Sequence, residues 1–139
     1  MLRIEYQSCV DYRASCDILR CNRNWYGQER RDCVIVEEED KPRRFARLRH
    51  LLRCKFRDNS LVDIAIITNF GALAAPWSPP TKWTGCVIVE EHTARLEFIR
   101  LAHITRGALL CPAFGSPRVT LFYPIDTVDN DMFLRLNNL

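Results

Sequence analysis

The feature that most constrains the fold is a hexapeptide that occurs twice. The sequence Cys-Val-Ile-Val-Glu-Glu stands at residues 33–38 and again at 86–91, and an ungapped alignment that extends both copies to His50 and His103 holds ten identical positions out of eighteen. Short runs of β-branched residues favour strands. A repeated unit of this kind predicts two structural units that pack in a similar way; the alternative is that the copies form two versions of one contact surface.

The acidic residues that end each hexapeptide are followed by a second apolar run, so the chain is expected to turn there and come back as a paired strand. We expect residues 33–38 to pair with 43–50, and residues 86–91 to pair with 94–103. These pairs belong to two related hairpins that cover 33–57 and 86–111.

The segment that follows the first copy alternates with a period of two. Its even positions are Ala46, Leu48, His50, Leu52, Cys54 and Phe56, and its odd positions include Arg47, Arg49, Arg53, Lys55 and Arg57. This pattern predicts a strand with its even side chains inside and its cations outside. A helix is the alternative, because Phe45, Leu48, Leu52 and Phe56 would also share one helical side.

Turn-forming residues divide the rest of the chain into short segments. Residues 1–7 are predicted to form a strand, 11–31 mainly a loop, and 69–82 a long loop with three prolines. Asp129 is a candidate N-cap for one helical turn that reaches Leu136. Further strands are expected at 61–68, 83–91, 95–104, 108–111 and 119–123. The prediction is a single domain, residues 1–139, that is mainly β: a small barrel or compact sandwich with long loops and at most one short helix.

The cysteines and the N-terminal residues indicate the cellular compartment of the protein. Seven cysteines, an odd number, lie mostly in apolar runs, as free buried thiols do. Glu5, Gln7 and Ser8 interrupt the first ten residues, where a secretory signal would be apolar, and no run is long enough to span a membrane. We expect an intracellular protein, nuclear or cytoplasmic, that does not enter a membrane and keeps its thiols reduced.

Positive charge is concentrated in one segment. Eight Lys and Arg lie between Lys41 and Arg57 without an acidic residue, so the other twelve face all seventeen Asp and Glu. Such a segment can follow a phosphate backbone, with an aromatic ring for base stacking. The candidate nucleic-acid-binding residues are Arg43, Arg44, Phe45, Arg47, Arg49, Arg53, Lys55 and Arg57. The alternative is a solvated face balanced by the acidic residues 37–40 across the hairpin.

Three aromatic residues lie in or next to the proline-rich segment 69–82: Phe70, Trp77 and Trp83. Rigid aromatic side chains on a loop give large contact area at low entropic cost. They are the candidate residues for binding a protein partner. The alternative is that the two tryptophans fill the end of the barrel as core residues.

Catalytic and metal-binding patterns are weak. The chain has no Cys-x2-Cys pair, no glycine-rich phosphate loop and no Gly-x-Ser-x-Gly elbow. His50, His103 and nearby cysteines leave a small thiol or zinc enzyme as an alternative. Asp126, Asp129 and Asp131 are predicted to serve turns and caps rather than calcium. No catalytic residue, metal or cofactor is predicted.

Several short motifs occur in an order that resembles a known family. They are Tyr12 with Cys21-Asn22 and Tyr26-Gly27, Arg31-Asp32-Cys33-Val34, Phe45-Ala46-Arg47-Leu48, Arg106-Gly107-Ala108-Leu109-Leu110, and Asp126-Thr127-Val128 through Asp131-Met132-Phe133-Leu134-Arg135. The chain resembles the C-terminal module of transposon-encoded proteins of mushroom-forming fungi, of the Kyakuja, Dileera and Zisupton kind.

The resemblance implies an accessory module, SH3-like or of the bromo-adjacent-homology type, because the catalytic core of that family lies upstream. The expected function is therefore that of a non-catalytic interaction module, which binds either a protein or a nucleic acid. A dedicated nucleic-acid-binding domain that uses residues 41–57 is the first alternative, and the thiol or zinc enzyme is the second.

Overall fold

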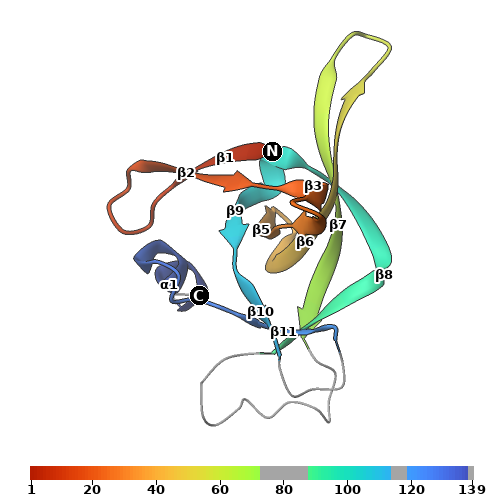
Figure 1. Ribbon diagram of the computed structural model, residues 1–139. Coiled ribbons are helices and arrows are strands. Elements are labelled where there is room, and N and C mark those ends of the chain that lie inside the picture. The colour runs from red at the N-terminus through yellow and green to blue at the C-terminus, as the bar shows by residue number, and fades with distance from the viewer. Residues whose placement is uncertain (73–87, 114–118, 138–139) are drawn as a thin grey trace.

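The computed structural model describes residues 1–72, 88–113 and 119–137, and in this part of the chain strands dominate. A seven-stranded antiparallel sheet has the order β10-β11-β8-β7-β6-β5-β9, and β1–β2 and β3–β4 form two separate two-stranded sheets (Figure 1). The strands are β1 (Leu2–Gln7), β2 (Ala14–Leu19), β3 (Cys21–Trp25), β4 (Gln28–Arg31), β5 (Cys33–Glu38), β6 (Lys41–Lys55), β7 (Leu61–Ala72), β8 (Val89–Arg100), β9 (Ile104–Ala108), β10 (Leu110–Pro112) and β11 (Leu121–Pro124). A 3-10 turn (Leu101–His103) and α1 (Asn130–Asn137) complete the elements, which confirms the mainly β class with one short helix.

The large sheet curls strongly without closing into a barrel. Its two end strands, β9 and β10, are consecutive along the chain and are separated only by Leu109. β9 pairs with β5, whereas β10 pairs with β11 at the other end of the strand order. One bent stretch of chain therefore supplies both edges of the sheet.

The sheet has a core on each of its faces. The larger core includes Val34, Val36, Leu48 and Ile67, all fully buried, and it is covered by Ile4 and Leu19 of the β1–β2 hairpin. The smaller core, on the other face, contains Cys33, Phe70, Val89 and Phe122. β5 contributes to both because successive side chains of a strand point to opposite faces. This explains why its first four residues are all buried.

The first predicted hairpin is confirmed. β5 pairs with β6 in a register that sets Cys33 opposite Arg47 and Glu38 opposite Lys41, with Glu39 and Asp40 as the connection. The β-branched run and the polar turn residues are local signals that agree with each other. The basic segment is a strand, and the helix alternative is wrong.

The second predicted hairpin, 86–91 with 94–103, is wrong. β8 continues as one bent strand through this segment, and its partners are β7 and β11. Residues 92–95, His-Thr-Ala-Arg, contain no Gly, Pro, Asn or Asp, so they lack the turn chemistry of the first copy. Residues 86 and 87 lie outside the described residues.

The prediction of mainly loop for residues 11–31 is also wrong, because β2, β3 and β4 lie there. β2 pairs with β1 along its full length, and β3 with β4. The turn between β3 and β4 is formed by Tyr26 and Gly27, both at positive φ, as a type I′ turn requires. These strands are short and mostly polar, so their pairing partners rather than their composition determine them.

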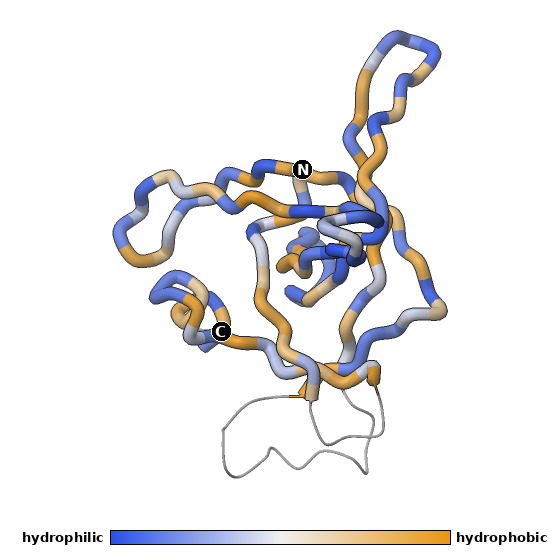
Figure 2. The backbone as a smooth tube through the Cα atoms, in the orientation of Figure 1, coloured by the Kyte–Doolittle hydropathy of each residue, from blue (hydrophilic) through white to orange (hydrophobic). Residues whose placement is uncertain are grey.

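The alternation predicted for 46–57 holds only as far as Leu48. Ala46 and Leu48 are fully buried, but the register with β7 shifts between Leu48 and His50. Beyond this bulge, β6 and β7 leave the body of the protein as a two-stranded arm (Figure 1). Leu52 and Phe56 on the arm are 43% and 53% exposed. The tube coloured by hydropathy ends this arm in a hydrophilic turn (Figure 2).

The C-terminal helix begins where the sequence predicts. The backbone N–H of Met132 donates to Asp129 Oδ1 at 2.7 Å, the hydrogen bond of an N-cap. Helix α1 extends over eight residues, about two turns rather than one.

Candidate interaction surface and pocket

Most of the predicted nucleic-acid-binding cations form ion pairs with carboxylates of the protein itself. Arg44 Nη2 lies 2.6 Å from Glu38 and 2.9 Å from Glu97. Arg43 pairs with Glu37, and Arg53 forms a two-pronged pair with Asp63 at 2.6 and 2.9 Å. Carboxylates of β5, β7 and β8 thus balance much of the positive charge of β6.

Arg47 and Arg49 share a single buried carboxylate, that of Glu91. Arg47 Nε lies 3.1 Å from Glu91 Oε1, Arg49 Nη2 lies 2.6 Å from the same atom, and the hydroxyl of Thr68 donates to it at 2.7 Å. The guanidinium of Arg47 also lies over the rings of Phe70 and Phe122, 5.5 and 5.0 Å from their centroids. A buried carboxylate held by two guanidiniums and a hydroxyl is fully hydrogen-bonded, as burial of a charge requires.

Lys55 and Arg57 are the two candidate cations that remain. Both are exposed at the end of the arm, and within the described ranges neither has an ion-pair partner. The structure therefore separates the seven predicted cations into five that pair with carboxylates and two at the arm tip.

The predicted aromatic residues are not brought together on an exposed loop in the part of the chain that is described. Phe70 is buried, in edge-to-face contact with Phe122 at a centroid distance of 5.4 Å, and Phe45 packs against the same core. Trp77 and Trp83 lie outside the described residues.

A set of exposed and half-buried apolar side chains forms what we call the outer face. Residues directly opposite each other on antiparallel strands share a face. Leu52 is opposite Ile64, Ile66 is opposite Phe98, and Thr68 is opposite Leu96. Phe98 is 66% exposed and Leu96 is 55% exposed. The outer face comprises Leu52, Phe56, Ile64, Ile66, Leu96 and Phe98.

The outer face lies on the same side of the sheet as the smaller core. Phe70, Thr68 and Ile66 alternate along β7, so the layer of Arg47, Arg49 and Glu91 separates the buried end of this face from its exposed end. The sequence pattern contained these residues, but the bulge at Leu48 and the bend of β8, which decide their exposure, left no signal in it.

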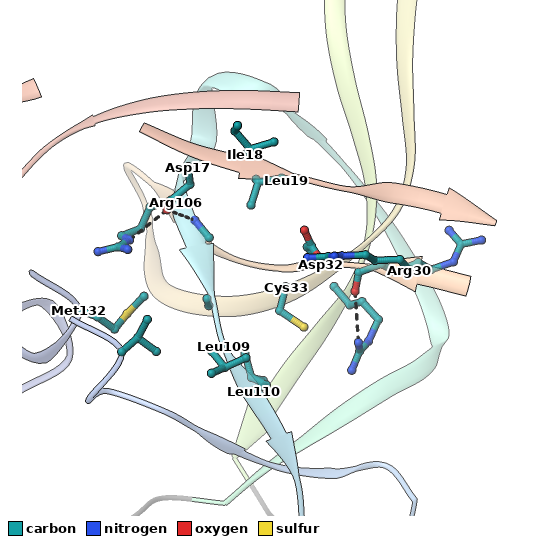
Figure 3. A pocket seen from close by; sticks show the side chains of 15 residues that line it. Asp17, Ile18, Leu19, Arg30, Asp32, Cys33, Arg106, Leu109, Leu110 and Met132 are labelled. Carbon is teal, nitrogen blue, oxygen red and sulfur yellow. Dashed lines mark hydrogen bonds and ion pairs between the residues drawn. The ribbon is translucent and has the colours of Figure 1, made fainter. Parts of the chain in front are cut away.

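A pocket of about 350 Å³ is lined by residues of β2, β4, β5, β9 and α1 (Figure 3). Leu19, Leu110 and Met132 supply apolar walls, and Asp32, which holds Arg30 at 3.1 Å, supplies a neutralised charge pair. The buried thiol of Cys33 also lines it, and burial raises the pKa of Cys33 to about 11. This thiol is protonated at neutral pH and is therefore a poor nucleophile.

Arg106 beside this pocket joins three separate parts of the chain. Its guanidinium lies 2.6 Å from Asp131, 2.8 Å from Asp129 and 3.3 Å from Asp17, and 4.5 Å from the ring centroid of Tyr6. Burial alone would lower its pKa, but the hydrogen bonds to Asp129 and Asp131 raise the pKa of Arg106 above its ordinary value. This arrangement fixes α1 to β9 and to the N-terminal hairpin.

Sequence reasoning missed this cluster because its partners are far apart in the chain. Asp129 has the predicted capping role, but Asp131 binds Arg106 and Arg135 instead of a turn. In the described ranges, no three His, Cys, Asp or Glu side chains are grouped as a metal site would need. His50 and Cys54 do share one side of β6, as their spacing predicts.

No helix among the described residues is long and apolar enough to cross a membrane. A scan against protein-family models, a search of curated proteins and a search of solved structures found no match to this chain.

Proposed function

We propose that this chain is a non-catalytic interaction module that binds a protein partner through the outer face. The observation that carries the proposal is the exposure of Phe98 and Leu96 on β8 and of Leu52 on β6, on either side of β7, with the exposed Phe56 just beyond the end of β6. Folded proteins place such side chains singly on their surfaces, whereas a contiguous group marks a binding site. The resemblance to an accessory module of transposon-encoded fungal proteins supports the same kind of role.

The rigidity of the underlying strands favours recognition without large rearrangement. Ile64, Ile66, Leu96 and Phe98 stand on β7 and β8, whose other face carries the larger core, where Ala65, Ile67 and Ile99 are buried. Side chains on a packed sheet lose little further freedom when a partner covers them, so more of the apolar burial contributes to affinity. Aromatic and large aliphatic residues are also the usual anchors of protein interfaces.

Nucleic-acid binding is the second candidate, and Lys55 with Arg57 at the arm tip is the observation that favours it. A two-stranded ribbon fits the major groove of DNA. Two cations free of carboxylates supply a small electrostatic contribution, however, because phosphate affinity grows with the number of cations that neutralise phosphates.

The test compares partners recovered with the wild-type chain and with Phe98→Ser in quantitative affinity purification from the native cell. Ile18→Ser, which removes an exposed apolar side chain from β2, is the matched control. We expect specific partners to be lost from Phe98→Ser and retained by Ile18→Ser. Equal recovery from all three proteins would refute the proposal.

The nucleic-acid candidate is tested in the same preparation by titration with a labelled duplex and a labelled single strand. Binding that weakens steeply as salt rises from about 50 to 200 mM, and that Lys55→Glu with Arg57→Glu removes, would favour it. Absence of such binding leaves the protein-partner proposal.

A further inference from the structure

Two polar side chains of β6 and β8 lie beside the apolar groups of the outer face. Arg100 is directly opposite Ile64, and His50 is directly opposite Ile66, so both belong to this face. Arg100 is exposed and, in the described part of the chain, has no carboxylate within ion-pair distance. Arg100 therefore places a positive charge at the border of the apolar group.

The acidic side chains of the same strands are directed elsewhere. Asp63 is opposite Arg53, and Glu97 is opposite Ile67, which places both on the face of the larger core. Glu91 shares the outer face, but it is buried and already holds Arg47 and Arg49. Two guanidiniums on one carboxylate leave a further net positive charge beside the apolar group.

The dimensions of the face match a single helix. Paired strands lie about 4.8 Å apart, so the axes of β6 and β8 are about 10 Å apart across β7. An α-helix with its side chains is about 10–12 Å in diameter. A helix placed along β7 would cover Ile64 and Ile66 and reach Phe98 on one side and Leu52 on the other.

We propose that the partner segment is an amphipathic helix whose apolar stripe is bordered by Asp and Glu. This inference rests on the proposed function and specifies the chemistry of its partner. The apolar stripe covers the outer face, and the acidic border pairs with Arg100 and with the excess charge at Arg47 and Arg49. A second copy of this chain would instead bring the same cations against each other.

The test is a selection of phage-displayed random 16-residue peptides, with the full chain as the target. Peptides that bind the wild-type chain are then counter-selected on Phe98→Ser. We expect the Phe98-dependent peptides to carry net negative charge, with apolar residues at helical spacing.

A synthetic copy of the most enriched peptide is then titrated by fluorescence anisotropy. Arg100→Glu should weaken its binding about tenfold or more, and the exposed Arg23→Glu on β3 should change it less than twofold. The weakening should diminish at high salt, because exposed charges are screened.

The outcomes separate this inference from the proposed function. Phe98-dependent peptides that are neutral or basic, or that bind Arg100→Glu as tightly as wild type, overturn the acidic helix and leave the interaction surface intact. A selection that yields no Phe98-dependent peptide overturns both.

Discussion

The two copies of Cys-Val-Ile-Val-Glu-Glu have the same sequence and different structural environments. The first copy is β5, a central strand between β6 and β9 that turns back immediately after its glutamates. In the second copy, Val89 to Glu91 begin the long strand β8, which continues past the glutamates without a turn. Local preference for a strand is shared, whereas the partner strands and the next four residues decide the topology.

The residues after each copy show the same contrast. Phe45 and Leu48 follow the first copy and pack into the cores, whereas the aligned Phe98 is among the most exposed apolar residues on the outer face. The aligned glutamates differ as well: Glu38 belongs to a half-buried network with Lys41 and Arg44, and Glu91 is buried beneath two arginines. One repeated pattern thus supports a packing role in one place and an exposed surface in the other.

The largest expected difference is between Leu48→Ala and the aligned Leu101→Ala. Leu48 is fully buried, so its truncation should lower the free energy of unfolding by about 3 kcal/mol or more. Leu101 is only partly buried beside the same core, and its truncation should cost about half as much. Urea denaturation of both variants measures the difference, and equal losses would contradict the packing contrast.

The next difference is between Glu91→Gln and Glu38→Gln. Neutralising Glu91 leaves two guanidiniums near a buried amide and should cost about 3 kcal/mol. Glu38 lies in a more accessible network, so its neutralisation should cost under about 1 kcal/mol. Thermal unfolding near neutral pH distinguishes the two variants. A larger loss for Glu38→Gln would reverse the assignment of the buried and accessible carboxylates.

The pH dependence of stability tests the ion pairs of Glu38, the last residue of the first copy. The hydrogen bond from Arg44 lowers the pKa of Glu38, with a further contribution from Lys41. A depressed carboxylate pKa contributes stability above the pKa of the unfolded chain, about 4.3, and this contribution disappears as pH falls through the folded value. The stability difference between wild type and Glu38→Gln should therefore shrink from pH 6 to pH 3. A difference independent of pH would contradict the charged pair.

The smallest expected effect comes from giving the second copy the turn residues of the first. Thr93→Asp with Ala94→Lys restores the residues found at positions 40 and 41, and both sites are exposed. The double variant should change the free energy of unfolding by about 0.5 kcal/mol or less. Amide hydrogen exchange should still show Ile66 paired with Phe98. A new hairpin in β8 would mean that local turn chemistry outweighs pairing with β7.

The features predictable from sequence were those with local causes. The β5–β6 hairpin joined a β-branched run to a polar turn, and Asp129 stood one position before the helix it caps. The β2, β3 and β4 strands carry weak patterns of their own and depend on their partners. The ion pair between Arg106 and Asp17 joins residues 89 positions apart, a distance over which periodicity carries no information.

The outer face shows the same limit of prediction from sequence within a single strand. Alternation correctly placed Leu52 on the side of β6 opposite Arg53 and Lys55, but it assigned that side to the interior, and it placed Arg47 on the wrong side relative to Leu52. A one-residue bulge between Leu48 and His50 and the departure of the arm from the body make that side solvent-exposed. The location of a bulge depends on both strands of a pair, so one strand's sequence cannot reveal it.

The bent segment from Ile104 to Pro112 also has a consequence for solubility. Unpaired strand edges are templates for pairing between molecules, and most sheets must protect two of them separately. Here one continuous segment covers β5 with its first half and β11 with its second, and it ends in a proline that cannot donate to a further strand. If this segment detaches, both of those strands lose their edge partner at once, so its local unfolding would expose two templates for pairing between molecules in a single event.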